Sequence, residues 1–351
     1  MSIGVRKQRI LDAIGHRCEG RFPTQLIFSP TLLDRVAEYL GVPAAGEDNL
    51  MEFTDSHFVY AYPNDALGKL RRRIWGGEKI IFDDWGVGYD MSAEGLCFCR
   101  FPLEDEADIT RYQFPDPDRE GMMDFAREAV EKFGDSHMVT AFHHVLIFER
   151  YWTLRGMENA MTDLLTDRDM VEDVMDKITD YQVRFAENFV KAGVGCARTG
   201  DDYGCQTGML ISPELWRELI KPRLARIWKV YKDVGLPIVH HTCGDVRPII
   251  PDLIEMGLDI LNDCQPEAMP IEELSEQFGD KIAFYGGLST QKVMPFGTRE
   301  EIFEEVRRAV EILGKYKGFI LSPGIALTSD VPFENIIALL DAFRQLNIAG
   351  S

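Results

Sequence analysis

Eight short runs rich in β-branched and aromatic residues recur along this 351-residue chain, and segments with helical periodicity separate several of them. Such alternation favours parallel strand pairing, right-handed crossovers and helices that cover the sheet. Eight is also the number of strands that closes a parallel barrel. The predicted strands are FPTQLIF (22–28), HFVYAYP (57–63), HMVTAFH (137–143), VGCARTG (194–200), PIVHHTC (237–243), LDILNDC (258–264), KIAFYGG (281–287) and GFILSPG (318–324). We therefore expect one α/β domain over 1–351, a (β/α)8 TIM barrel, with an open doubly wound sheet as the alternative.

Two intervening segments carry clear helix signals. Residues 211–235 read ISPELWRELIKPRLARIWKVYKDVG, in which Ser212 can cap the helix and Pro213 suits the first helical position. Gly235 is a typical helix end. Residues 297–314 place acidic side chains early in the helix, where they complement its dipole. One helix is predicted in each segment.

A long insert, roughly residues 66–136, separates the second and third predicted strands. It is expected to form a hairpin and a lid over one barrel end. Connections of this length in compact domains more often have a functional role than none. A simple packing extension is the alternative. Trp85 and Tyr89, in DDWGVGYD, are candidates to line the pocket of a flat substrate, although packing within the insert is equally compatible with the pattern.

The charge of the chain narrows the classes of partner. A net charge of −20 and a pI near 4.8 argue against a nucleic-acid or anionic-membrane surface. No apolar run approaches the roughly 18 residues of a membrane span, and the N-terminal residues lack a signal-peptide core. Seven scattered cysteines suit a reducing compartment better than a disulfide scaffold. We expect a cytoplasmic protein that acts on a small molecule, without nucleic acid or membrane.

The stretch VHHTCGD ends the fifth predicted strand. Side chains two residues apart on a strand share a face, so His241 and Cys243 are expected to point the same way. The C-terminal strand ends of a TIM barrel form its active-site rim. An imidazole and a thiolate at this spacing suit zinc, but two ligands do not complete a site. A hydrogen-bonded histidine beside an inert buried cysteine is the alternative.

The fourth predicted strand ends in RTGDDYGCQTG. Asp201 and Asp202 are adjacent, so they should face different directions and only one need enter a pocket. We take Asp202 as the candidate general acid, metal ligand or substrate anchor. Helix capping or loop solvation is the alternative. Tyr203 and Gln206, in the same loop, are candidate substrate-binding residues.

Other chemically capable side chains follow other strand ends. In FHHVLIFER, His143 and His144 have structural interpretations as well as functional ones, and His144 is taken as a substrate-binding candidate. Glu149 is a stronger catalytic candidate, because a carboxylate among apolar residues needs a partner if it is buried. Cys264, at the end of LDILNDC, is a possible third metal ligand.

Several long stretches resemble the uroporphyrinogen decarboxylase superfamily. They are GDDYGCQTGMLISPELWRELIKPRL, VHHTCGDVRPIIPDLIEMGLDILNDCQPEA, FYGGLSTQ and LSPGIALTSDVPFENIIALLDAF, together with WGVGYD and PLEDEADITRYQFPDPD in the insert. The resemblance covers nearly the whole chain. It implies one (β/α)8 barrel with an active site at the C-terminal rim.

Within that superfamily, the chain is more similar to the corrinoid-linked methyltransferases, such as the methylcobalamin:coenzyme M enzymes. It lacks the arginine-rich RQAGRY-like segment and the GHGI-like histidine motif that the resemblance would require of a true uroporphyrinogen decarboxylase. Thiol-methylating members bind zinc through a His-x-Cys pair, which His241 and Cys243 match, and through a later cysteine. Here that later region reads LSPGIAL, with only Ser322 nearby. The departure leaves two alternatives: the third ligand comes from Glu149, Asp202 or Cys264, or no metal binds.

The resemblance thus implies a methyltransferase that acts with a separate corrinoid protein and moves a methyl group to or from a small molecule. Zinc on His241 and Cys243 would polarise the reacting heteroatom. The alternative is a decarboxylase of a small or tetrapyrrole carboxylic acid, and a third class is a catalytically silent binding barrel.

Overall fold

The computed structural model describes residues 3–42, 47–65, 68–69, 79–91 and 97–347. A curled, all-parallel sheet of seven strands forms its centre, in the order β1-β5-β6-β9-β10-β11-β12. These strands are β1 (Phe58–Ala61), β5 (Met138–His144), β6 (Cys196–Gly200), β9 (Ile238–His241), β10 (Ile260–Cys264), β11 (Ala283–Leu288) and β12 (Phe319–Pro323). They are almost entirely buried, as expected of a parallel sheet covered by helices. The architecture is TIM-barrel-like.

Seven of the eight predicted strands are confirmed, but residues 22–28 form no regular strand. Thr24 makes isolated parallel bridges with Ser56, just before β1, and with Leu321 of β12. Phe28 makes another with Leu327. Pro23 has no amide hydrogen to donate, and Pro30 already begins the next helix, so a continuous ladder cannot form here. The extended segment still connects the two edge strands.

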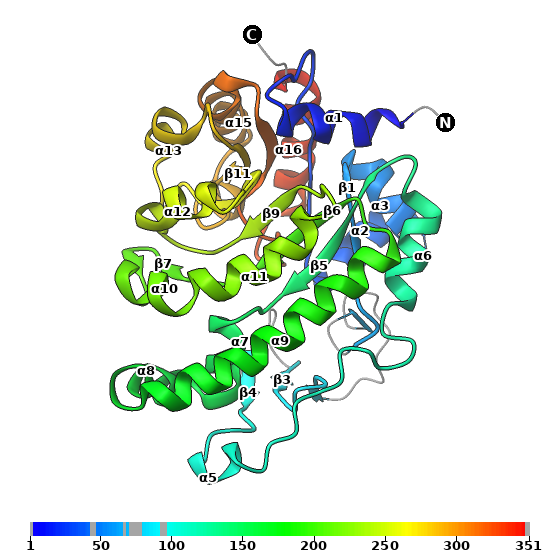
Figure 1. Cartoon of the computed structure of the whole chain (residues 1–351). Helices are drawn as coiled ribbons and strands as arrows, with labels where there is room; N and C mark the ends of the chain where they lie inside the picture. Colours follow the sequence, from blue (N-terminus) through cyan, green and yellow to red (C-terminus); the bar gives the residue numbers. More distant parts are fainter. Residues whose placement is uncertain (1–2, 43–46, 66–67, 70–78, 92–96, 348–351) are drawn as a thin grey trace.

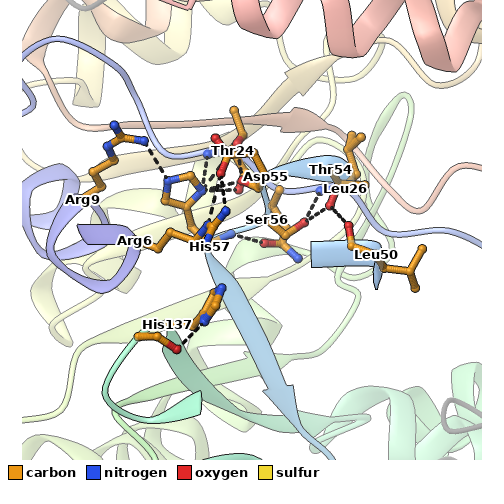
Figure 2. Close-up of polar contacts among 12 residues, drawn as sticks. Arg6, Arg9, Thr24, Leu26, Leu50, Thr54, Asp55, Ser56, His57 and His137 are labelled. Atoms are coloured by element: carbon orange, nitrogen blue, oxygen red, sulfur yellow. Dashed lines mark hydrogen bonds and ion pairs between the residues drawn. The ribbon is translucent and has the colours of Figure 1, made fainter. Parts of the chain in front are cut away.

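Buried polar groups hold this segment at the N-terminal end of β1 (Figure 2). The His57 ring lies beside Thr24 and Asp55, with its Nδ1 2.8 Å from the Asp55 carbonyl oxygen. Thr24 Oγ1 donates to the same carbonyl oxygen at 2.7 Å. Arg9 lies on the opposite edge of the ring, 3.5 Å from Nε2. Active sites in such folds lie at the C-terminal ends of the strands. We therefore assign these hydrogen-bonded buried groups, at the N-terminal end of β1, a role in stability.

Helices pack around the sheet, and Figure 1 shows the long α9 alongside α11. The helices are α1 (Val5–Ile14), α2 (Pro30–Leu40), α3 (Glu47–Thr54), α5 (Glu106–Ile109), α6 (Asp124–Phe133), α7 (Phe148–Arg155), α8 (Met157–Thr166), α9 (Arg168–Ala192), α10 (Pro213–Leu219), α11 (Lys221–Lys232), α12 (Ile250–Glu255), α13 (Ile271–Phe278), α14 (Val293–Phe296), α15 (Arg299–Leu313) and α16 (Phe333–Leu346). Two 3₁₀ turns cover Arg247–Ile249 and Gly314–Tyr316. Among the described helices, none has both the length and the apolar character needed to cross a bilayer.

The predicted cap at Ser212 is present, but one predicted helix is two. Ser212 accepts a hydrogen bond from the Leu215 amide at 3.1 Å, and Thr298 forms a capping box at the start of α15. The single helix expected over 211–235 breaks at Ile220 into α10 and α11. Pro222 explains the break, because its ring cannot donate a hydrogen bond and crowds the preceding turn.

The insert forms more than a hairpin. Strands β2 (Ile80–Phe82), β3 (Gly88–Asp90) and β4 (Cys97–Arg100) make a separate antiparallel sheet at the end of the molecule opposite α1 and α16 (Figure 1). Residues 66–67, 70–78 and 92–96 of the insert lie outside the described part of the chain. Arg150 of α7 donates to Asp83 at 2.7 Å, and both side chains are buried. This ion pair joins the insert to the rest of the fold.

Candidate functional site

Polar side chains lie side by side where the central strands end. The register pairs His144 of β5 with Gly200 of β6, Gly200 with His241 of β9, and His241 with Asn262 of β10. Four neighbouring strands therefore bring their last or near-last residues to one row. The C-terminal ends of parallel strands are the usual place for chemistry in this architecture.

The two adjacent aspartates after β6 have different surroundings. Asp201 is fully buried and accepts the backbone amides of Ile147, Phe148 and Glu149 at 3.0, 2.9 and 2.7 Å. Burial raises the pKa of Asp201 to about 6, although these three amides oppose the shift. Asp201 therefore holds the loop after β5, and Asp202 is the one that reaches the cavity.

Asp202, His241 and Cys243 bring three potential ligand atoms together, each within 4.8 Å of the others. Cys243 Sγ lies 3.6 Å from His241 Nε2, and Asp202 Oδ1 lies 3.7 Å from the same nitrogen. In a tetrahedral zinc site, bonds of about 2.1 Å to nitrogen and about 2.3 Å to sulfur place the nitrogen and sulfur ligand atoms about 3.6 Å apart. The group thus fits a zinc ion in both chemistry and spacing. Strand β9 ends at His241, so loop geometry, as well as strand alternation, positions Cys243.

Asn262 sets the orientation of the His241 ring. Its Oδ1 accepts from His241 Nδ1 at 2.9 Å, and its Nδ2 donates to the Tyr285 carbonyl oxygen at 3.1 Å, which defines the direction of the amide. The proton of His241 then resides on Nδ1, and Nε2 presents its lone pair towards Cys243 and Asp202. Metal-binding histidines commonly have such an outer hydrogen-bond partner.

The thiol and a nearby carboxyl favour their neutral forms in the metal-free protein. Burial, followed by the Asp202 carboxylate, raises the pKa of Cys243 well above its ordinary range. Burial and the carboxylates of Asp202 and Asp201 also raise the pKa of Glu149. Glu149 Oε2 accepts from the Asp202 amide at 3.2 Å. A metal ion would reverse the preference of the thiol, because binding it releases the thiol proton.

A cavity of about 320 Å³ lies beside this group of residues, within the usual size range for small-molecule sites. Glu149, Asp202, His241 and His144 line it, together with aromatic side chains and the residues after β12. Phe98 of β4 also lines it, so the insert contributes to its wall. The His144 ring stacks on Phe142, with centroids 4.4 Å apart. Cys243 contacts His241 but is not among the residues that line the cavity.

Other predicted site residues lie elsewhere. Trp85 and Tyr89 are buried in the insert, where Tyr89 donates to Asp83 and Trp85 packs on Tyr181 and beneath Arg150. Tyr203 is buried against His240 and Trp216, on the side of β9 that faces the helices.

Gln206 is exposed and contacts Gln291. Cys264 is fully buried, donates to the Leu261 carbonyl oxygen, and is absent from the group formed by Asp202, His241 and Cys243. His143 bonds Gln182 and Tyr231 on the helix-facing side of β5, which is a structural role. The structure therefore places none of these three side chains in the cavity lining.

Arg198 and Asn262 are cavity residues that the sequence interpretation did not select. Both lie on predicted strands, in CARTG and ILNDC, two positions from a strand end. An arginine inside a run predicted to be buried was the available signal, because a buried charge requires a partner or a function. Tyr60, Tyr62 and Tyr285 are further lining residues without a motif of their own.

The chain is similar to several known proteins. The family model described as "Uroporphyrinogen decarboxylase (URO-D)" matches residues 79–346. A methylated-thiol–coenzyme M methyltransferase of Methanosarcina mazei is 24% identical over 199 residues, which are 56% of this chain and 50% of that protein. A methylcobamide:CoM methyltransferase, MtaA, of Methanosarcina barkeri is 27% identical over 174 residues, 50% of this chain and 48% of that one. The chain thus aligns with about half the length of these relatives.

A solved structure described as a methyltransferase from Methanosarcina mazei superimposes over 97% of this chain and 99% of its own, with a TM-score of 0.68 and 19% identity. At that identity the similarity concerns the fold.

Proposed function

Because the chain belongs to the uroporphyrinogen decarboxylase (URO-D) family, we propose that it is a methyltransferase that moves a methyl group between a small molecule and a corrinoid carried by a separate protein. The observation that carries the proposal is the group formed by Asp202, His241 and Cys243 beside a small-molecule cavity. The named activities of the two Methanosarcina relatives support methyl transfer as the reaction class.

In this proposal Asp202, His241 and Cys243 hold zinc. When bound, zinc supplies a Lewis acid that polarises the heteroatom to or from which the methyl group moves. Asn262 keeps His241 in the tautomer whose Nε2 is a ligand. The Cys243 amide donates to Asp202 Oδ1 at 2.8 Å and so keeps this carboxylate next to the other two ligand residues.

Glu149 is the proposed proton donor. A heteroatom that loses its methyl group as a cation equivalent must gain a proton to leave as a neutral product. Burial favours the protonated form of Glu149, which lines the cavity beside Asp202. Its carboxyl group can therefore give up that proton and recover it from solvent through the cavity mouth.

The ligand set favours a particular kind of methyl donor. An oxygen ligand from Asp202, in place of a second sulfur, makes a metal ion harder and more electrophilic. Such an ion suits the oxygen of a methyl ether or the nitrogen of a methylamine better than a thiol sulfur. We therefore expect demethylation of an ether or amine.

The tetrapyrrole decarboxylase alternative finds less support in the cavity. Among the described lining residues, Arg198 is the one lysine or arginine, and Glu149 and Asp202 add negative charge. A substrate with several carboxylates would require more positive charge than this cavity offers. A decarboxylase of a small acid remains the competing activity.

The test is zinc content together with activity. Protein purified without chelator should hold about one zinc per chain by mass spectrometry of the metal, and Cys243→Ser should lose most of it. Cys196→Ser is the matched control, since Cys196 is buried on β6 and absent from the ligand group. Wild type should also convert free cob(I)alamin to methylcobalamin with a methoxy compound, followed by absorbance. A metal-free wild type that still forms methylcobalamin would overturn the zinc proposal, whereas decarboxylation of a small acid without methyl transfer would favour the competing activity.

A further inference from the structure

Arg198 is a buried cation in the wall of the cavity. It lies in the middle of β6, is 4% exposed, and lines the cavity together with His144, His241 and Asn262. Moving a charged side chain out of water is unfavourable unless a partner compensates it.

The protein compensates Arg198 incompletely. The other deeply buried arginines each contact a carboxylate: Arg150 contacts Asp83, Arg155 contacts Asp163 and Arg223 contacts Asp176. Within the described residues, by contrast, no carboxylate lies within ion-pair distance of Arg198. Its protein partners are His144 Nε2 and the Asn262 Oδ1 atom, the latter at 3.0 Å. Its Nε is buried, with no hydrogen-bond partner in the described part of the chain.

Aromatic rings surround this cation. The guanidinium carbon lies 5.3 Å from the ring centre of Tyr60 and 5.6 Å from that of Phe142. Tyr62, Phe98 and Tyr285 are further aromatic residues of the cavity lining. Rings reduce the cost of burying the cation but leave its hydrogen-bonding capacity unused. A ligand that fits here should combine an apolar body with one anionic group.

Arg198 lies beside the ligand group. Its Nη2 and His241 Nδ1 both donate to Asn262 Oδ1, at 3.0 and 2.9 Å. Tyr60 and Phe142 contact the same guanidinium. A small molecule in the cavity can therefore present an anionic group to Arg198 while its apolar body lies against these rings, close to the ligand group.

We propose that Arg198 binds the carboxylate of a small monocarboxylic acid with an apolar or aromatic body, and that this acid is the substrate. The planar guanidinium can donate two parallel hydrogen bonds to a carboxylate, which gives affinity and orientation together. Only the identification of the acid as methyl donor rests on the proposed function. Recognition of the acid itself requires neither zinc nor corrinoid.

Binding can therefore be measured on protein freed of metal with EDTA. The probes are 4-methoxybenzoate, benzoate and hexanoate, each compared with its neutral amide by isothermal titration calorimetry at fixed pH and ionic strength. Wild type should bind at least one acid about tenfold or more tightly than its amide, the preference expected of a charged hydrogen bond. This comparison uses the unaltered protein, so it does not depend on any variant folding.

Variants then assign the preference to Arg198. Arg198→Met should abolish the acid-over-amide preference, and Arg198→Lys should restore part of it. Arg247→Met is the control, because Arg247 lies in the loop after β9 but is already paired with Asp245; it should keep the preference. Equal binding of acids and amides, binding of none of the acids, or an unchanged preference in a folded Arg198→Met protein would each overturn the inference. Loss of methyl transfer with this preference intact would count against the proposed function alone.

Discussion

The side-chain oxygen of Asn262 lies 2.9 Å from Nδ1 of His241, on the strand next to it. This contact determines which ring nitrogen of His241 is available to the group formed with Cys243 and Asp202. It also makes the ligand group depend on a residue that does not belong to it.

Replacing Asn262 with leucine should lower zinc affinity by about 10- to 100-fold, as loss of an outer hydrogen-bond partner commonly does. Competition with a chromophoric chelator measures the change. Asn335→Leu is the control: Asn335 is also buried, but it bonds the carbonyl oxygens of Met294 and Gly297. An Asn262→Leu protein with wild-type zinc affinity would show that His241 needs no such support.

Asp201→Asn should destabilise the fold by about 1–3 kcal/mol, because one of the two oxygens that accept backbone amides is replaced by a donor. Urea denaturation gives the free energy of unfolding. Asp202→Asn should cost less, since Asp202 is partly exposed and, within the described part of the chain, its carboxylate accepts one backbone amide, that of Cys243. Equal losses in the two variants would contradict the different roles assigned to these neighbours.

The buried pair of Asp83 and Arg150 should anchor the insert. Asp83→Asn is expected to destabilise the protein by about 3–5 kcal/mol, because it leaves the Arg150 charge buried without its partner. Adding Arg150→Met should recover part of that loss in a double-mutant cycle. Asp124→Asn, at an exposed pair with Arg127, should change stability by less than about 1 kcal/mol. Limited proteolysis within residues 79–136 should accelerate in Asp83→Asn only.

His143 should contribute to acid sensitivity. Burial lowers the pKa of His143 to about 4, below its ordinary value near 6.5. The unfolded chain therefore takes up a proton at this residue before the folded chain does. Its stabilising effect is complete above pH 6.5 and is lost as the pH falls towards 4, with a slope of at most about 1.4 kcal/mol per pH unit.

The measurement is the free energy of unfolding between pH 7 and 4 in wild type and His143→Gln. The variant should be less stable at pH 7, yet its stability should fall less steeply. Buried His57 and His240 also have lowered pKa values and will keep some slope in both proteins. An unchanged slope in His143→Gln would refute the prediction.

Local pattern in the sequence was sufficient for the strand and helix alternation, the cap at Ser212, and the assignment of His241 and Asp202 to strand ends. These features depend on alternation and on short-range hydrogen bonds, which neighbouring residues determine. The same reasoning failed at two segments in which a proline outweighs the periodicity or composition of its neighbours. Residues 22–28 have strand composition but include Pro23, and the helix over 211–235 contains Pro222, whose effect is stronger than that of helical periodicity.

Tertiary structure alone decided which strand ends meet and which side chains complete the site. The register that aligns His144, Gly200, His241 and Asn262 depends on how whole strands stagger against one another, and spacing along the chain does not encode that distance. For the same reason Asp202, rather than Cys264, joins His241 and Cys243. Tyr89 packs within the insert and Trp85 packs between the insert and helices α7 and α9, where Asp83 and Arg150, 67 positions apart in sequence, form an ion pair. Arg198 faces the cavity because the curl of the sheet, a property of all its strands together, turns that side of β6 inward.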